Sequence, residues 1–238
     1  MTRYLLLILL LFPSVYLTGA QAIAEDSDSL AHRSAQRFMV SRPEDSSEFP
    51  PLHLLQTALA GYEILVEDSS ISRPEVITII DFSLQSDRER LWVIDLHQGK
   101  VLYHCLVSHG RNSGELMAES FSNIPGSNAS SPGFYVTGET YIGKHGLSLT
   151  LDGLETGIND KARARAIVIH GADYVSDDFI RTHGRLGRSQ GCPAVPVELS
   201  NEIIKTIKGG SCLFIYAPIP EYKTNSHIIR KIHPITRT

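Results

Sequence analysis

Short runs of β-branched and aromatic residues, separated by connections rich in glycine and serine, constrain the fold of this chain most strongly. Such runs are typical of strands, and only four residues, 97–100, join the second run to the third, as in a hairpin turn. The pattern predicts a mainly β domain whose sheet is mostly antiparallel and begins as a meander. The predicted strands cover residues 76–82, 90–96, 101–107, 133–137, 147–151, 166–169 and 211–216.

Two segments show helical periodicity instead. Leu55, Leu59 and Tyr62 recur at helical spacing after Pro51, which predicts an amphipathic helix packed on the sheet. Residues 197–207 precede a pair of glycines and predict a second, capped helix. We therefore expect a few short helices beside the β structure.

The two ends of the chain differ from this β-rich body. An arginine, an apolar run over 4–17 and small residues near position 22 predict a signal peptide over residues 1–22, and with it export to the periplasm or cell envelope. An uncleaved membrane anchor is the alternative. The acidic, serine-rich residues 23–50 predict a flexible leader, followed by a folded domain over 51–220 and a loose, basic tail over 221–238.

Composition limits the classes of partner. The 238 residues are 42% hydrophobic and carry a net charge of -4, enough for one sizeable core and without the basic excess of a nucleic-acid-binding protein. The sequence holds no glycine-rich phosphate loop, no Cys-x-x-Cys pair and no His-Glu-x-x-His motif. We expect no cofactor and no nucleic acid, and the sequence indicates no protein partner.

One cysteine lies in a setting suited to catalysis. Cys192 stands in the small-residue loop 188–194, downstream of an apolar run that ends in His170. A loop thiol near a strand-end histidine is the arrangement that a thiolate nucleophile and its base require. A helical turn starting at Pro193 would lower the thiol pKa and stabilise an oxyanion. The sequence therefore predicts a cysteine acyl-transfer enzyme.

The other histidines and cysteines are ranked by their surroundings. His170 is favoured as the base because a strand holds it, whereas His183, the competing base, lies in a polar stretch. Cys105 and Cys212 lie in strand-like runs and are interpreted as structural, either as buried thiols or as one disulfide.

Further residues are candidates for substrate or oxyanion contacts. Gly191 would let the backbone come close to a bound carbonyl. Ser189 is interpreted as orienting the loop or binding substrate, with a plain turn serine as the alternative. Arg185 and Arg188 are expected either to pair with a substrate carboxylate or to be solvated surface charges. His109 is predicted to line the same cleft, and because the histidine and cysteine spacings match no zinc pattern, no metal is expected.

At these residues the chain resembles the L,D-transpeptidase catalytic domain of the YkuD type, in the branch whose nucleophile loop reads Ser-x-Gly-Cys-Pro-Ala. The resemblance spans about residues 76–218 and is carried by several motifs in order. They are Ser108-His109-Gly110, Ser130-Ser131-Pro132-Gly133-Phe134-Tyr135, Tyr141-Ile142-Gly143-Lys144-His145-Gly146, Gly157-Ile158-Asn159-Asp160, His170-Gly171-Ala172 and Ser189-Gln190-Gly191-Cys192.

The resemblance implies a β-sandwich or barrel with a few short helices, in which Cys192 is the nucleophile, His170 the base, and the Gly171 carbonyl orients the histidine. It further implies attack on the third residue of a peptidoglycan stem tetrapeptide, release of D-alanine, and transfer of the acyl group to a side-chain amine of a neighbouring stem. Carbapenem-type β-lactams are the implied inhibitors. An L,D-carboxypeptidase, in which water takes the acyl group, and an inactive peptidoglycan-binding module are the alternatives.

The chain departs from the commoner family pattern in two places. Gln190 and Pro193-Ala194 stand where that pattern has a histidine and a polar residue, which bears on oxyanion contacts and on the choice of acceptor. The interval from His170 to Cys192 is longer than usual. It implies an inserted segment at 173–187, which we expect to act as a lid over the cleft.

Overall fold

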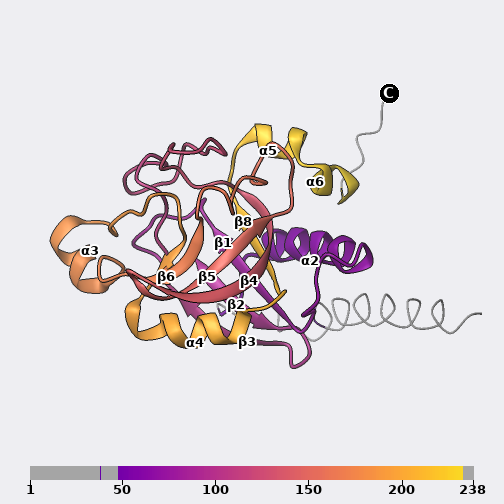
Figure 1. Cartoon of the computed structure of the whole chain (residues 1–238), viewed down its shortest axis with the longest axis horizontal. Coiled ribbons are helices and arrows are strands. Elements are labelled where there is room, and N and C mark those ends of the chain that lie inside the picture. The colour runs from indigo at the N-terminus through magenta and orange to yellow at the C-terminus, as the bar shows by residue number, and fades with distance from the viewer. Residues whose placement is uncertain (1–37, 39–47, 233–238) are drawn as a thin grey trace, which may run out of the picture.

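The computed structural model of the chain describes Phe38 and residues 48–232. Its centre is an eight-stranded sheet in the order β3-β2-β1-β8-β4-β5-β6-β7, which curves until it is nearly closed into a barrel (Figure 1). The predicted mainly β fold with a few short helices is confirmed. The strands are β1 (Val76–Asp81), β2 (Leu91–Asp95), β3 (Lys100–Cys105), β4 (Gly133–Gly143), β5 (Gly146–Gly153), β6 (Val168–Gly171), β7 (Ala194–Val195) and β8 (Cys212–Tyr216).

The first three strands form the expected antiparallel meander, with β2 in the middle. The last strand, β8, lies between the two halves of the sheet, parallel to β1 and antiparallel to β4. Four of its five residues are buried, which accounts for an apolar run without alternation. The last strand in the sequence, β8, thus joins the two halves of the sheet.

The two ends of the sheet meet beside the loop 188–194. β3 forms one edge and β7 the other. The backbone N–H of Ser108, just after β3, donates to the carbonyl of Ala194 in β7 at 2.8 Å, and Gly110 bridges Ser189. These contacts bring the segments after β3 and before β7 together and fix the position of the loop that carries Cys192.

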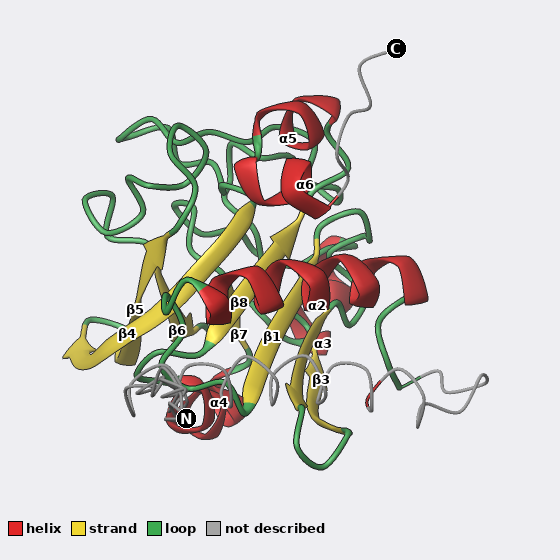
Figure 2. Cartoon of the chain, turned by 90° about the vertical axis from the view of Figure 1, so that its right-hand side faces the viewer, coloured by secondary structure: helices red, strands yellow, loops and turns green. Residues whose placement is uncertain are grey.

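Helices cover both faces of the sheet, and the two predicted helices are present. Figure 2 shows α2 lying across β1 and β8. Ile77 and Ile79 of β1 belong to the same core cluster as the buried face of α2, whereas Ile80 belongs to a second cluster that includes Ile203 and Ile207 of α4. The helices of the described residues are α2 (Leu52–Glu67), α3 (Asp177–His183), α4 (Val197–Ile207), α5 (Pro220–Asn225) and α6 (His227–Ile232).

The C-terminal segment differs from the predicted loose tail. Residues 220–232 form α5 and α6, whose Tyr222 and Ile228 are buried in the core cluster of α2. The buried Glu155 accepts hydrogen bonds from Tyr222 Oη at 3.0 Å and from Ser226 Oγ. The expectation of a loose tail was wrong for these residues, because two short helices anchored by few apolar side chains leave little periodicity in the sequence.

The predicted signal peptide, most of the predicted leader and residues 233–238 lie outside the described residues. Phe38 and Phe49 pack edge to face with ring centroids 5.3 Å apart, and Phe38 belongs to the core cluster of α2. In the part of the chain that the structure describes, no helix is both long and apolar enough to cross a bilayer.

The two strand cysteines are buried free thiols, Cys105 on β3 and Cys212 on β8. β2 and β1 lie between these strands. Their separation of three strand spacings, roughly 14 Å, exceeds the Cα distance that a disulfide can bridge. The structure therefore supports the interpretation as two buried thiols over that as a disulfide.

Candidate active site

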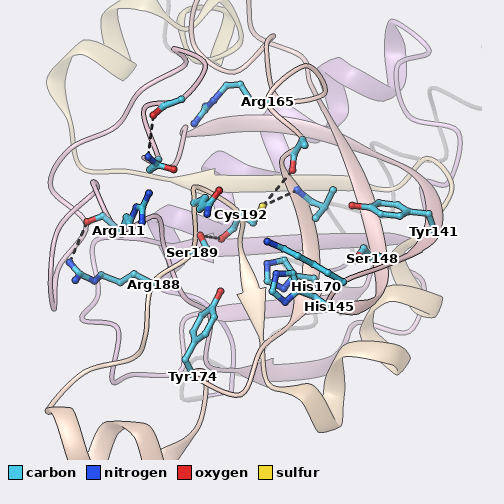
Figure 3. Close-up of a pocket in the computed structure, with 17 residues that line it drawn as sticks. Arg111, Tyr141, His145, Ser148, Arg165, His170, Tyr174, Arg188, Ser189 and Cys192 are labelled. Carbon is cyan, nitrogen blue, oxygen red and sulfur yellow. Dashed lines mark hydrogen bonds between the residues drawn. The ribbon is translucent and has the colours of Figure 1, made fainter.

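A pocket of about 480 Å³ opens where the loop 188–194 meets the edge of β6. Cys192 and His170 both line it, and Figure 3 shows the two side chains next to each other. The other walls come from the loop after β3, the β4–β5 turn and the segment before β6. The fold thus places the predicted nucleophile and the predicted base in one pocket.

Hydrogen bonds within the loop fix how Cys192 is presented. Ser189 Oγ donates to the Cys192 carbonyl at 2.6 Å and accepts from the Gly191 N–H at 3.0 Å. Gly191 has a φ of 118°, and a Cβ there would come within 2.8 Å of the Ala129 carbonyl oxygen. Both the backbone conformation and the lack of space therefore require glycine. The hydroxyl of Ser189 is engaged within the loop, the first of the roles expected for it.

The Cys192 thiol lies against the start of β6. The Val168 N–H donates to Sγ at 3.5 Å, and the carbonyl oxygen of Ala166 is 3.6 Å from Sγ. Burial raises the pKa of the Cys192 thiol, whereas the Val168 N–H and the charges of Arg165 and Lys144 act to lower it. The resting group is therefore a thiol rather than a thiolate, so its use as a nucleophile requires a base.

The expected helical turn at Pro193 is absent. Residues 194–195 form β7, and α4 begins only at Val197. No helix N-terminus follows the cysteine directly, so the lowering of the thiol pKa that such a turn would supply is absent. The pairing of β7 with β6 and with Ser108 explains the difference, because these contacts hold the backbone extended.

His170, on β6, has one ring nitrogen engaged and one available. Nδ1 lies 2.9 Å from the carbonyl oxygen of Gly171, which can only accept, so Nδ1 carries the proton and Nε2 keeps a lone pair. Burial lowers the pKa of His170, and the charges of His145 and Lys144 lower it further, against a rise due to the Gly171 hydrogen bond. Near neutral pH the ring is therefore uncharged with a free acceptor nitrogen, the state a general base needs.

His183, the competing candidate for the base, lies outside the pocket. His183 is exposed at the end of α3, its ring stacks on Phe179 with centroids 4.0 Å apart, and it does not line the pocket. Of the inserted segment 173–187, Tyr174 alone lines the pocket. The segment contains α3, and its Leu186 lies in a small buried apolar cluster. The structure thus favours His170 over His183 as the partner of the thiol.

Arg185 and Arg188, expected either to hold a substrate carboxylate or to be solvated surface charges, are both paired within the protein. Arg185 Nε lies 2.9 Å and Arg188 Nη1 2.6 Å from the carboxylate of Glu115. Arg188 lines the pocket and also donates to the Gly114 carbonyl at 3.1 Å, whereas Arg185 does not line the pocket. Their partner lies on the loop after β3, far away in the sequence, which is why spacing could not indicate it.

The prediction that His109 lines the cleft was wrong, because its side chain is buried and does not line the pocket. Its Nδ1 accepts from Arg90 Nη2 at 2.9 Å. Burial, aided by the Arg90 charge, lowers the pKa of His109 to about 4. Arg90 is itself buried and donates to the carbonyls of Leu84 and Val107. His109 therefore helps to hold the loop after β3 in place.

Sequence reasoning assigned no role to two side chains of the β4–β5 turn, Lys144 and His145, which both line the pocket. The His145 ring stacks on the His170 ring with centroids 4.4 Å apart and planes 20° apart (Figure 3). The motif at 141–146 was the only signal for this contact. That the tip of this hairpin reaches back over His170 depends on the curvature of the sheet, which the sequence does not reveal.

Arg165 was also missed, although it lies just before the strand that carries His170. Its guanidinium donates to Ser131 Oγ at 2.6 Å, to the Ser122 carbonyl at 2.7 Å and to the Ala129 carbonyl at 2.5 Å. These bonds hold the long loop between β3 and β4 against the wall beside Cys192. Arg165 thus has a structural function in addition to its charge.

The pocket offers a thiol, a neutral imidazole and several cations. Its lining contains no aspartate or glutamate. Within Phe38 and residues 48–232, no group of three or more His, Cys, Asp or Glu side chains is placed to hold a metal ion. These groups are suited to nucleophilic and acid–base chemistry on an anionic substrate.

Residues 50–216 match the family model YkuD_2, described as the L,D-transpeptidase catalytic domain. No curated protein sequence matches. Similar solved structures include an L,D-transpeptidase from Mycobacterium smegmatis, with 12% identity, a TM-score of 0.38 and coverage of 60% of this chain and 59% of that one. L,D-transpeptidase 3 from Mycobacterium tuberculosis, in complex with a faropenem-derived adduct, has 10% identity, a TM-score of 0.40 and coverage of 60% of each chain. An L,D-transpeptidase from Stackebrandtia nassauensis has 13% identity, a TM-score of 0.36 and coverage of 82% and 80%. The chain thus spans about three fifths of the length of the first two.

Proposed function

The chain belongs to the L,D-transpeptidase catalytic domain family, and from this premise we propose that it is an exported cysteine acyltransferase that acts on peptidoglycan stem peptides. One observation carries the proposal. The Cys192 thiol and the His170 imidazole, both uncharged at rest, share a pocket in which Nδ1 of His170 is held by the Gly171 carbonyl. A neutral thiol beside a neutral base is converted to a nucleophile by one proton transfer.

In the proposed first step, His170 Nε2 takes the proton of the Cys192 thiol as Sγ attacks the carbonyl carbon of the third residue of a stem tetrapeptide. The tetrahedral intermediate collapses when the C–N bond to the terminal D-alanine breaks. The departing amine takes the proton from His170, and a thioester on Cys192 remains.

In the proposed second step, a side-chain amine of a neighbouring stem attacks the thioester carbonyl. The amine gives a proton to His170, the C–S bond breaks, and the sulfur recovers the proton from His170. One amide bond is exchanged for another, so the reaction needs neither a cofactor nor an external energy source. If water replaces the amine, the same intermediate yields the tripeptide, which is the L,D-carboxypeptidase reaction.

Export belongs to the proposal because peptidoglycan lies outside the cytoplasm, and the signal peptide predicted over residues 1–22 supports it. Carbapenem-type β-lactams are proposed as inhibitors because their strained carbonyl would acylate the same sulfur. Stem peptides are the only partners proposed.

The test is to incubate the purified domain with a disaccharide tetrapeptide and to identify the products by mass. A crosslinked dimer with free D-alanine is the expected result. Tripeptide without dimer would assign the carboxypeptidase activity, and intact substrate bound without turnover would indicate a peptidoglycan-binding module. Cys192→Ser should abolish product formation, and Cys105→Ser, which removes a buried thiol that does not line the pocket, should not.

A further inference from the structure

The pocket around Cys192 is lined by four basic side chains, Arg111, Lys144, Arg165 and Arg188, and by no acidic one. Such a lining attracts anions and repels ammonium groups, because no acidic side chain lines the pocket beside these cations. A bound substrate can pair only with those of the four cations that are not already paired within the protein.

Two of the four are committed to the protein itself. Arg165 donates to oxygen atoms of the long loop between β3 and β4, and Arg188 is paired with the carboxylate of Glu115. Arg111 and Lys144 are different: both are exposed, and neither side chain makes a hydrogen bond or ion pair with another described residue. Arg111 and Lys144 are therefore the cations free to bind a ligand.

Arg111 and the β4–β5 turn that carries Lys144 lie on different sides of Cys192 (Figure 3). Figure 3 shows Arg111 on one side of Cys192, and His145, the neighbour of Lys144 in the β4–β5 turn, on the other side. Lys144 is close enough for its charge to affect the titration of both Cys192 and His170. A substrate whose scissile carbonyl sits at Sγ would therefore extend toward a cation in each direction.

We propose that Arg111 and Lys144 bind carboxylate groups on either side of the bond that is attacked, so that the preferred acyl donor is a stem peptide whose carboxyl groups are free rather than amidated. This inference rests on the proposed function for the identity of the donor. The carboxylate of the terminal D-alanine would meet one cation, and a carboxylate preceding the scissile bond would meet the other. An ion pair between a carboxylate and a guanidinium or ammonium is the strongest common hydrogen-bonded contact in such a pocket.

The first experiment compares two synthetic tetrapeptide donors, one with the free carboxyl group before the scissile bond and one with a carboxamide there. We expect the free acid to react with a kcat/KM about tenfold higher, the size of one charge-assisted hydrogen bond. The preference for the free acid should shrink in Lys144→Met or in Arg111→Met, depending on which of the two residues binds that carboxyl group. It should also weaken at high salt, because both cations are exposed. Lys100→Met, which removes an exposed cation on β3 outside the pocket, is the matched control.

The second experiment does not depend on transpeptidase activity. Cys192 is alkylated with iodoacetate, which is anionic, and with iodoacetamide, which is neutral, and the ratio of the two rates is measured. Because both reagents need the same thiolate, the ratio cancels changes in the thiol pKa and reports the attraction of the pocket for a carboxylate. The ratio should fall several-fold in the double variant Arg111→Met and Lys144→Met and should stay unchanged in Lys100→Met.

The two experiments separate the two proposals. An active enzyme with equal rates on both donors and an unmoved alkylation ratio would overturn the carboxylate-binding roles of Arg111 and Lys144 alone. A ratio that falls as expected in an enzyme that turns over neither donor would support carboxylate binding while overturning the proposed function.

Discussion

The imidazole rings of His145 and His170 stack with their centroids 4.4 Å apart and their planes 20° apart. The stack joins the tip of the β4–β5 hairpin to the proposed base on β6. It fixes the plane of the His170 ring, which the Gly171 carbonyl already holds at Nδ1. It also places a titratable group against the base, so the pH dependence of the reaction should depend on His145.

The first prediction concerns that pH dependence. His170 must be neutral to accept a proton, and burial, followed by the charges of His145 and Lys144, lowers its pKa from 6.5. The acid limb of kcat/KM should therefore lie below pH 6.5, with activity falling as the pH drops through it. His145→Phe keeps an aromatic ring for the stack and removes the charge, so the pKa of His170 should rise and the acid limb should move to higher pH.

His145→Ala serves as the comparison, because it removes the stack as well as the charge. It should show the same shift of the limb and, in addition, a lower plateau rate. Identical profiles for wild type, His145→Phe and His145→Ala would mean that the stack has no influence on the base.

The second prediction is that acylation is confined to Cys192. A carbapenem should add one adduct to the wild type, seen by intact mass, and none to Cys192→Ala. Burial raises the pKa of Cys105 to about 12, and burial also raises that of Cys212, so neither supplies thiolate near neutral pH. An adduct mapped to either buried thiol by peptide sequencing would contradict this assignment.

The third prediction separates the two candidate bases. His170→Ala should slow acylation by about 10²- to 10⁴-fold, the usual effect of losing a general base. His183→Ala should keep most of the rate, because its ring stacks on Phe179 outside the pocket. Stopped-flow measurement of β-lactam acylation gives both numbers, and the reverse ranking would transfer the role to His183.

The sequence predicted those parts of the fold that are coded locally. The hairpin between β2 and β3, the apolar face of α2 and the strand that carries His170 all follow from residue patterns within short windows. The two central catalytic candidates were found the same way, because a loop cysteine and a strand-end histidine are each visible in a few residues.

The parts that were missed depend on contacts between distant segments. Arg185 is paired with Glu115 and does not line the pocket, and the buried His109 is hydrogen-bonded to Arg90. The pairing of β7 with β6 replaced the helical turn expected after Cys192. In each of these places a neighbour supplied by the tertiary fold outweighed the local preference of the sequence, and no pattern within the segment itself could reveal that neighbour.

The fourth prediction tests the packing of the C-terminal helices. Tyr222 Oη donates to the buried carboxyl group of Glu155 at 3.0 Å. Tyr222→Phe removes this donor without leaving a cavity, so it should lower the free energy of unfolding by about 1 kcal/mol, seen as a lower urea midpoint. Tyr103→Phe is the control, because Tyr103 on β3 is only partly buried. Equal midpoints for Tyr222→Phe and wild type would show that the bond adds nothing to stability.

The last prediction concerns how the thioester avoids water. Tyr174 is the residue of the inserted segment 173–187 that lines the pocket, and Figure 3 shows its hydroxyl pointing toward the loop that carries Cys192. Excluding water from the acyl-enzyme favours an amine acceptor over hydrolysis. Tyr174→Ala should therefore raise the ratio of tripeptide to crosslinked dimer while leaving β-lactam acylation of Cys192 largely intact.

Two further variants test whether the Tyr174 ring or the whole inserted segment 173–187 keeps water from the acyl-enzyme. Tyr174→Phe keeps the ring and should keep the wild-type product ratio. Replacing α3 by a short glycine–serine linker should also keep it, because the residues of α3 do not line the pocket and Leu186 still anchors the segment in its apolar cluster. If Tyr174→Ala leaves the ratio unchanged, the inserted segment is not the water barrier. The loop between β3 and β4, which Arg165 holds against the opposite wall, then becomes the element that sets the partition between the two products.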